Sequence, residues 1–374
     1  MSTFLTPDVV AKIALPILQD QIVAVGQVFT DYSAEYVNVG DTITIRKPAS
    51  FVANEFNGTT AVQNIEETGV SLKIDKWKDV SFAITGRERA LDIADLSERV
   101  IRPAIIPIVT AIEDDILALY KSCPYHYGTA GVTPASLEAF SNVAGILDKN
   151  KTPDDGQKCL ILNNTSTIKL RPLLTVLGGG NAGAAAPSNA MERARLAYDL
   201  YGMKPFTSQR VNSHVAGVPG GSPVITVDVS VNALQGTIAA GGNAGTFKKG
   251  DLFAVATSTQ QFVVTEDLEL TSGGGGTLKF YPAMTADVTS QAVTVVASHS
   301  ASMAFHKNAI ALAVRQLELP DSGPKAAYQY DPQTGIGVRV VNGWDYNAQR
   351  EVMSIGVLYG CAMILPEFAC RVIG

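Results

Sequence analysis

The side chains in this sequence that could do chemistry are few and do not cluster. Among the 374 residues, the histidines are His126, His214, His299 and His306, and the cysteines are Cys123, Cys159, Cys361 and Cys370. The cysteines show no Cys-x-x-Cys spacing, and the nearest approach to a ligand pair is Cys123 with His126. A structural zinc ion needs four ligands, which usually come as two close pairs. The sequence therefore predicts no metal, no cofactor and reduced, buried thiols.

Motifs for hydrolytic catalysis are also missing. Neither Gly-x-Ser-x-Gly nor His-Glu-x-x-His occurs in the chain. Asp321-Ser322-Gly323 matches half of an aspartic-protease site, but that chemistry needs a second such triplet to complete its carboxylate pair. The glycine-rich stretch 178–183 lacks the Gly-Lys-Ser/Thr of a phosphate-binding loop. We therefore predict a protein that is not an enzyme.

Charged side chains gather instead around a pair of predicted strands in residues 36–84. Residues 41–46 alternate polar with β-branched side chains, and residues 70–74 and 80–84 alternate similarly, as half-buried strands do. The segment between them is polar, and its Asn57-Gly58 pair is a strong turn signal. The pattern predicts a long two-stranded arm with a basic base and an acidic tip.

An isolated two-stranded ribbon is barely stable in water, so such an arm should lie on another surface, most simply a neighbouring subunit. The alternatives are an ordinary hairpin packed on its own domain and an acidic tip that is only a solvated turn. If the tip does contact a neighbour, the first basic partners to suspect lie just after the arm. The candidate inter-subunit contact residues are Arg46, Lys47, Glu55, Glu66, Glu67, Arg87, Arg89, Arg99 and Arg102.

Residues 92–123 organise the chain around a predicted long helix. Their apolar residues recur at steps of three and four, and Asp92 is a plausible N-cap. Pro103 and Pro107 each remove a helical hydrogen bond. The segment is therefore either one long bent helix or a short helix followed by a longer one that starts near Pro103.

The rest of the chain alternates in type. We expect helices over residues 7–28, 133–147 and 189–202, a further helix capped by Asn164-Thr165-Ser166, and a short strand at 158–162, which together indicate an α/β subdomain. Residues 303–317 read as a helix or a helix–strand junction. Strands are expected at 335–341 and 347–365, and the C-terminal residues should join a sheet.

Residues 217–300 differ from everything before them. Five short β-type runs, at 224–229, 252–256, 261–264, 277–281 and 292–297, are separated by glycine-rich turns, and no helical period occurs. This pattern predicts a small sandwich or barrel. Because α/β character resumes afterwards, we interpret these residues as a β-domain inserted into another domain.

Composition bounds the class of protein. Hydrophobic residues make up 46% of the chain and charged residues 17%, which is typical of an ordered protein with a large core. The net charge of −6 gives no global basic field for nucleic acid or an anionic membrane. The first residues lack the basic start and apolar core of a signal peptide, and no apolar run reaches about 18 residues, so we expect no membrane span.

In this order, the parts resemble the major capsid protein of tailed double-stranded-DNA bacteriophages. Residues 39–48, VGDTITIRKP, are similar to the strand that enters the arm in that family, and residues 304–312, AFHKNAIAL, to the segment after the insert. Residues 345–367 are similar to the family's C-terminal strands. The inserted β-domain resembles that of the short-tailed-phage coat lineage. The two prolines in the spine helix depart from the family pattern.

The resemblance implies an α+β capsid fold with an N-terminal arm, an extended β-arm, a long spine helix, peripheral and axial domains, and an inserted all-β barrel or sandwich domain. The implied segments are an N-terminal arm at 1–35, the β-arm with a peripheral strand at 36–84, the spine helix at 85–131, the axial domain at 132–216, the inserted domain at 217–300, and the return to both domains at 301–374.

The resemblance also implies a function and partners. The chain would self-assemble as hexamers and pentamers of an icosahedral shell around packaged double-stranded DNA, which it would contact without sequence specificity. Scaffolding protein, portal and decoration protein are the other implied partners, with no membrane. The subunit would be made and assembled in the host bacterial cytoplasm and would end up in the virion.

Two alternatives stay open at this point. A cellular nanocompartment shell shares the fold but would lack the β insert and would need an enzyme cargo. An enzyme with a β-sandwich appendage would need a pocket lined with titratable groups, and the sequence shows no cluster from which to build one.

Overall fold

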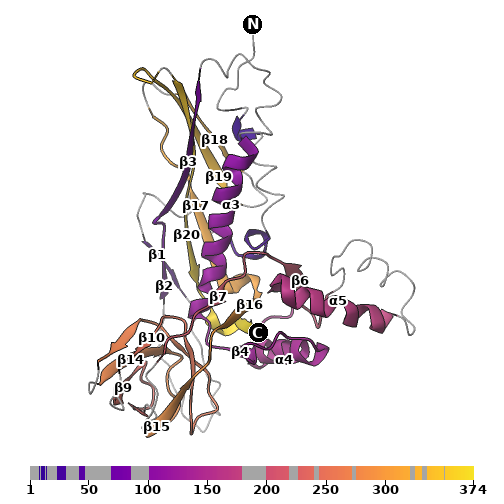
Figure 1. The fold of residues 1–374 in the computed structure, drawn as a ribbon, viewed down its shortest axis with the longest axis vertical. Coiled ribbons are helices and arrows are strands. Elements are labelled where there is room, and N and C mark those ends of the chain that lie inside the picture. The colour runs from indigo at the N-terminus through magenta and orange to yellow at the C-terminus, as the bar shows by residue number, and fades with distance from the viewer. Residues whose placement is uncertain are drawn as a thin grey trace, which may run out of the picture. The chain divides into compact units, whose positions relative to one another are not determined.

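The computed structural model describes residues 8, 10–12, 14, 23–30, 42–46, 69–85, 101–178, 199–218, 226–239, 244–271, 275–320, 325–330, 335–348 and 350–374. The chain forms two compact units. Unit 1 comprises Met1–Gln21, Phe29–Val109 and Ala311–Ile364, and unit 2 comprises Ile22–Val28, Thr110–Ile310 and Leu365–Gly374. Strands dominate the described part of both units (Figure 1).

Unit 1 is built on a five-stranded sheet. Its order is β17 (Ile310–Arg315), β20 (Arg350–Met363), β19 (Gly337–Asp345) and β18 (Lys325–Tyr330), and β3 (Lys76–Thr85) also pairs with β20. Strands β18, β19, β20 and β3 are antiparallel to their neighbours. Residues of opposite parity point to opposite faces of a sheet, and here one face buries Val340, Met353 and Ile355. The strands predicted at 335–341 and 347–365 are confirmed.

The base of the predicted arm is a two-stranded ribbon. Strands β1 (Thr42–Arg46) and β2 (Gly69–Lys73) pair antiparallel, from Thr42 opposite Lys73 to Arg46 opposite Gly69. The ribbon's base also touches its own chain, because β2 contacts β20. A side chain at Gly360 of β20 would place its Cβ 2.1 Å from the carbonyl oxygen of Lys73, so glycine is required for this approach. Residues 47–68, which include the predicted tip, lie outside the described residues.

Helix α3 spans Arg102–Leu117 and continues as the 3₁₀ helix η5 (Ala118–Ser122). Pro103 lies in the first turn, where its missing N–H costs little, and Pro107 lies inside the helix. Residues 86–100, with the predicted cap Asp92, lie outside the described residues, so the choice between one long bent helix and two helices stays a prediction. Ile105, Ile108, Ile112 and Ile116 are buried, as their spacing predicts.

Unit 2 contains a mixed sheet covered by helices. The strand order is β4 (His126–Gly128), β21 (Ala369–Ile373), β16 (His299–His306), β5 (Lys158–Leu162) and β6 (Lys204–Thr207), and β7 (Ser213–His214) also pairs with β16. The helices are α4 (Leu137–Lys149) and α5 (Asn164–Gly178). Phe140, Val143 and Leu147 of α4 pack with Leu160 and Cys370 of the sheet. The predicted strand 158–162 and the C-terminal strand are confirmed.

A closed six-stranded barrel forms the rest of unit 2 (Figure 1). Its strands are β8 (Thr226–Val229), β9 (Gln235–Ala239), β11 (Leu252–Val255), β12 (Phe262–Val264), β14 (Gly276–Tyr281) and β15 (Val288–Val295). They close in the order β11-β12-β14-β9-β8-β15, and the rings of Phe253, Phe262 and Phe280 meet in the core. A separate ribbon joins β10 (Gly245–Phe247) to β13 (Leu268–Leu270).

Several sequence predictions need correction. Residues 303–317 are not a helix but the end of β16, the short 3₁₀ helix η6 (Lys307–Ala309) and β17. Both strands are buried almost throughout, and a run that is apolar on both faces carries no period that separates a strand from a helix. The last 3₁₀ turn, η7 (Pro366–Phe368), precedes β21.

The ends of other helices also differ from prediction. The N-terminal helix does not run to residue 28, because residues 25–27 form the 3₁₀ helix η1 (Val25–Gln27). The helix predicted to end at Gly202 is absent from residues 199–203, where Leu200 and Met203 form a β-bridge around a turn with positive φ at Tyr201 and Gly202. Helix α4 starts four residues later than expected, and its N-cap is Ser136.

Candidate functional site

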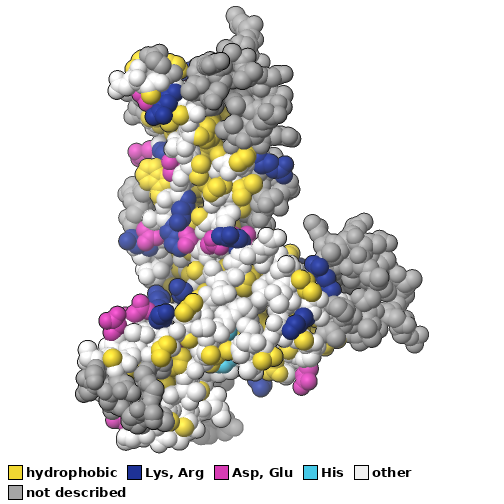
Figure 2. All heavy atoms as spheres, in the orientation of Figure 1, with side chains coloured by type: hydrophobic (Ala, Val, Ile, Leu, Met, Phe, Trp, Pro, Cys, Tyr) yellow, Lys and Arg dark blue, Asp and Glu magenta, His cyan; other side chains and the backbone are white. Residues whose placement is uncertain are grey.

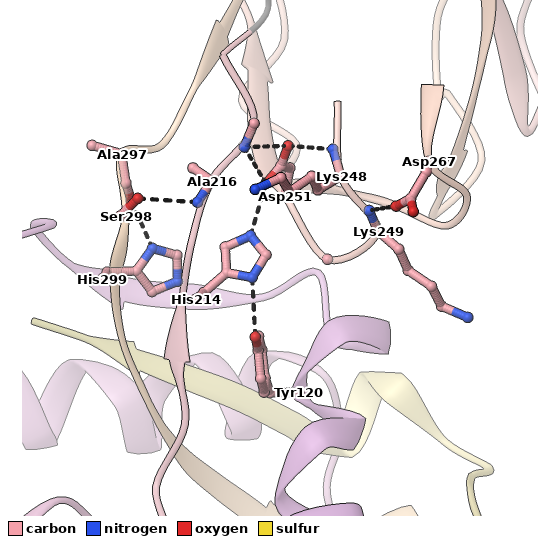
Figure 3. Close-up of polar contacts among 12 residues, drawn as sticks. Tyr120, His214, Ala216, Lys248, Lys249, Asp251, Asp267, Ala297, Ser298 and His299 are labelled. Carbon is pink, nitrogen blue, oxygen red and sulfur yellow. Dashed lines mark hydrogen bonds and ion pairs between the residues drawn. The ribbon is translucent and has the colours of Figure 1, made fainter. Parts of the chain in front are cut away.

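Titratable side chains converge where the barrel joins the sheet of unit 2 (Figure 3). Tyr120 comes from η5, His214 from β7 and Asp251 from the turn between β10 and β11. His214 Nε2 lies 2.7 Å from Asp251 Oδ1, and His214 Nδ1 lies 3.0 Å from the Tyr120 hydroxyl. All three side chains are buried. Of the described residues, these make the arrangement that most resembles a catalytic one.

The carboxylate of Asp251 is saturated with hydrogen bonds. Its oxygens also accept from the backbone N–H groups of Lys248, at 2.7 Å, and Gly217, at 3.1 and 3.2 Å. A Cβ at position 217 would lie 2.2 Å from the carbonyl oxygen of Thr246, so only glycine can bring this N–H to the carboxylate.

The hydrogen bonds fix the proton positions along this chain of side chains. A carboxylate can only accept, so His214 donates from Nε2 to Asp251. In the neutral ring Nδ1 is then an acceptor, and Tyr120 donates its hydroxyl proton to it. Burial raises the pKa of Tyr120, which is the opposite of what an activated nucleophile needs. The arrangement therefore suits a structural tie between barrel, sheet and helix.

A buried arginine lies beside the network of Tyr120, His214 and Asp251. Arg371 of β21 is 0% exposed and donates from Nη1 to the carbonyl oxygen of Gly250, at 2.8 Å. Its guanidinium carbon lies 5.0 Å from the ring centroid of Tyr120, a cation–π contact. Burial lowers the pKa of Arg371 to about 10. The turn 248–251 is therefore held to the sheet by two contacts, from Arg371 to Gly250 and from His214 to Asp251. Removing one partner of a buried charge is costly.

A cleft of about 550 Å³ opens beside this network. Tyr120 and His214 lie in its wall, and the other lining residues include charged side chains of both signs, namely Lys121, Lys248, Lys249, Asp267 and Glu269. Lys249 N donates to Asp267 Oδ1 at 2.5 Å, which ties the β10–β11 turn to β13. The exposed fractions of Tyr120 and His214 are only 3% and 4%. A substrate in the cleft would therefore meet lysines and carboxylates rather than the tyrosine–histidine pair.

The described residues contain no group of three or more histidine, cysteine or acidic side chains that could hold a metal ion. Cys123, Cys159 and Cys370 are buried free thiols, and Cys361 is half-buried. Burial raises the pKa of the Cys123 thiol to about 11, so this thiol is unreactive at neutral pH. Among the helices in the described part of the chain, none has the length and apolar character that crossing a membrane requires.

Two of the predicted contact residues lie in the described part of the chain. Arg46 ends β1 opposite Gly69, and Arg102 is an exposed residue at the start of α3. The others lie outside the described residues: Lys47, Glu55, Glu66, Glu67, Arg87, Arg89 and Arg99. Sequence reasoning in turn missed the network of Tyr120, His214 and Asp251. The sequence offered two signals, the glycine at 217 and the Gly-Asp turn at 250–251. A glycine can mark a close backbone approach, but it does not tell which residue is approached.

His306 shows what a lone histidine on an apolar segment can do. It is fully buried at the end of β16, and its Nδ1 accepts from the backbone N–H of Asn308 at the start of η6. Its Nε2 bonds Asp155 at 2.9 Å.

No family model matches this sequence, and no curated protein matches it. Solved structures do. Over 94% of this chain and 91% of the other, the fold is similar to a structure of Mycobacterium phage Che8, with 13% identity and a TM-score of 0.51. The capsid structure of the Cyanophage P-SCSP1u covers 92% of this chain and 85% of its own, with 13% identity and a TM-score of 0.49. The bacteriophage PhiM1 mature capsid structure matches over 90% of this chain and 84% of its own, with 11% identity and a TM-score of 0.46. At these identities the likeness concerns the fold alone, and over nearly its whole length this chain has a fold found in bacteriophage structures.

Proposed function

We propose that this chain is a major capsid protein, the structural subunit of an icosahedral shell that encloses a phage double-stranded DNA genome. The observation that carries the proposal is the similarity to the Mycobacterium phage Che8 structure over 94% of this chain and 91% of that one. A match of that extent involves both units and the barrel together, and not one common motif. A fold does not by itself fix a function, so the remaining support comes from the surfaces.

One face of the sheet in unit 1 carries exposed aromatic side chains that suit a subunit contact. Trp77 of β3 is 57% exposed and Tyr330 of β18 is 47% exposed, and the strand registers place both on the same face. Arg339 lies between them with its guanidinium carbon 5.4 Å from the Trp77 ring. Tryptophan, tyrosine and arginine are the residues most enriched at the centres of protein interfaces.

The charge distribution suits a container wall. Lysine and arginine side chains are interspersed with acidic ones on the face drawn in Figure 2, where no broad basic patch forms among the described residues. The net charge is −6. Tight binding of duplex DNA requires many basic side chains that release counterions from the phosphates. A shell wall without such a set of basic side chains can enclose DNA without binding it tightly.

In this proposal the parts take the roles that the resemblance implies. Unit 1 supplies the peripheral domain and the base of the β-arm, and α3 is the spine. The sheet with α4 and α5 forms the axial domain, and the barrel is an inserted domain. Scaffolding protein, portal and decoration protein would be partners, and assembly would take place in the host bacterial cytoplasm. A cellular nanocompartment shell is not favoured, because the barrel lies between β7 and β16 as an addition that such a shell would not need.

Electron microscopy of the purified protein, with its sedimentation profile, tests the proposal. We expect closed shells or sheets of hexamers, either spontaneously or with a scaffolding partner or crowding agent. A monodisperse monomer that never assembles under any of these conditions would contradict the proposed function.

A further inference from the structure

Three of the four histidines in the chain lie where the barrel joins the sheet of unit 2. In the sheet of unit 2, His299 of β16 pairs with His214 of β7, and His126 of β4 pairs with Arg371 of β21, which itself pairs with Met303 of β16. Paired residues share a face of a sheet, so these side chains lie on one face, and the core beneath α4 is on the other face of the same sheet. The fourth histidine, His306, has even numbering on β16 and faces the other way.

His214 and His299 also mark the two places where the chain enters and leaves the barrel. The barrel strands begin after β7 and end before β16, so residues 213–217 and 296–300 form a two-chain neck, in which Ser213 pairs with Ser300 and His214 with His299. A hydrogen bond from Ala216 N to Ser298 Oγ, at 3.0 Å, joins the two chains of the neck (Figure 3). The barrel has its own hydrophobic core, distinct from that of the sheet and helices, and a small cluster of Leu252, Val263 and Ile373 joins the barrel to β21. Loosening the neck would therefore unfold neither of the two main cores.

The two neck histidines respond differently to a proton. His214 already donates to Asp251 from Nε2, and a protonated Nδ1 could donate to the Tyr120 oxygen, so both of its bonds survive. His299 bonds the carbonyl oxygen of Ala297 through Nδ1 at 2.8 Å, so Nδ1 must carry the proton of the neutral ring. Its buried Nε2 has no hydrogen-bond partner in the described part of the structure. Protonation would add there a charged N–H group without an acceptor.

The groups around His299 add to this cost. Arg371 is fully buried, and its Nε and Nη2 likewise have no hydrogen-bond partner among the described atoms. His214, from β7, lies with its ring centroid 5.4 Å from that of His299, and His126 faces the layer from β4. Asp251 offsets one positive charge, and Tyr120 and Cys123 are buried and neutral. Burial first, and then the charge of Arg371, lower the pKa of His299 to about 4, and burial lowers that of His126.

We propose that the neck is an acid-sensitive latch, in which protonation of His299 beside Arg371 opens the pairing of β7 with β16, while both hydrophobic cores and the bonds from His214 to Asp251 and from Arg371 to Gly250 stay formed. The closed neck needs a neutral His299. Its stabilisation is therefore complete above the ordinary histidine pKa of 6.5 and is lost as the pH falls from there towards about 4. The full gap between those values corresponds to roughly 300-fold in the equilibrium between the closed and the open neck.

Hydrogen–deuterium exchange of the unassembled full chain tests the latch without any need for assembly, so its result is independent of the proposed function. Exchange is measured at pH 7.5 and pH 4.5 and corrected for the intrinsic pH dependence of amide exchange. We expect exchange in residues 212–218 and 296–301 to accelerate at least about tenfold at pH 4.5, whereas β5, β21 and the barrel strands stay protected.

His299→Asn is the informative variant, because its amide can donate to the Ala297 carbonyl but cannot take up a proton. We expect its neck to stay protected at pH 4.5. His306→Asn is the matched control and should behave as the wild type. The proposal is overturned if the wild-type neck stays closed at pH 4.5, if His299→Asn opens as the wild type does, or if the whole of unit 2 loses protection at once. Should His299→Asn fail to fold at pH 7.5, the wild-type comparison alone still decides whether the neck opens.

Discussion

At the scale of single residues, Asp251 is a buried polar group whose two carboxylate oxygens both have hydrogen-bond donors. Asp251 accepts from one imidazole and two backbone N–H groups while it is 0% exposed. A buried carboxylate stabilises the fold only while its donors stay in place. Its contribution to the free energy of unfolding is therefore better measured by removing its charge than by counting its contacts.

Asp251→Asn should destabilise the protein by about 2–4 kcal/mol at pH 7. The new amide can still accept from His214, but its NH₂ would face the N–H groups of Gly217 and Lys248, leaving buried donors without an acceptor. Chemical denaturation of the isolated subunit measures the change. Asp287→Asn is the matched control, since Asp287 is exposed and accepts from only one backbone N–H, that of Val231, at 2.7 Å. Equal effects at both positions would contradict this interpretation.

The sequence could not have revealed this network. Tyr120, His214 and Asp251 are 94 and 37 residues apart, and none belongs to a local motif. Their meeting depends on how β7, η5 and the β10–β11 turn are stacked, which is a property of the tertiary structure. By contrast, the cap of α4 is local, and a serine followed by a helical apolar pattern is enough to predict it within a few residues.

At the scale of elements, prediction succeeded where one face of an element is solvated. The strands at 42–46, 69–73 and 76–85 alternate in the sequence because only one face is buried, and α3 and α4 show the corresponding helical stripe. Prediction failed at β16 and β17, which are buried on both faces, and at the short strands β6, β10 and β13, which were not foreseen. Strands of three or four residues contain too few positions to show a period.

The barrel should respond to core mutations as a unit of its own. Phe262 is 0% exposed, stacks on Phe253 at 5.2 Å and meets Phe280 edge-on at 5.4 Å. Phe262→Ala should cost about 3–5 kcal/mol and raise exchange in the barrel strands, with little change in β5 or β21. Phe140→Ala, in the core beneath α4, should show the reverse pattern. Simultaneous loss of protection in both cores after either substitution would show that barrel and sheet unfold together.

At the scale of the whole molecule, the negative net charge and the interspersed surface charges leave local complementarity to direct assembly. The arm predicted from residues 36–84 carries acidic residues at 55, 66 and 67, and basic residues at 87, 89, 99 and 102 follow it, interspersed with acidic residues at 88, 92, 95 and 98. In a single chain these two groups have no need to meet. In a shell, an arm that reaches a neighbouring subunit would place one group on the other.

Reversing the charge of the arm tip should therefore weaken assembly in a way that depends on salt. Glu66→Lys with Glu67→Lys would set ammonium groups against the neighbour's arginines, and the repulsion extends about 10 Å at 0.1 M salt but only about 3 Å at 1 M. We expect fewer shells by sedimentation at low salt, partial recovery at high salt, and recovery at low salt when Arg99→Glu and Arg102→Glu are added. Glu266→Lys, at an exposed carboxylate on the barrel, is the control and should leave assembly unchanged. If the arm variant assembles as the wild type does at every salt concentration, the acidic tip is a solvated turn. The contact between subunits must then depend on apolar side chains such as Trp77, whose attraction salt does not screen.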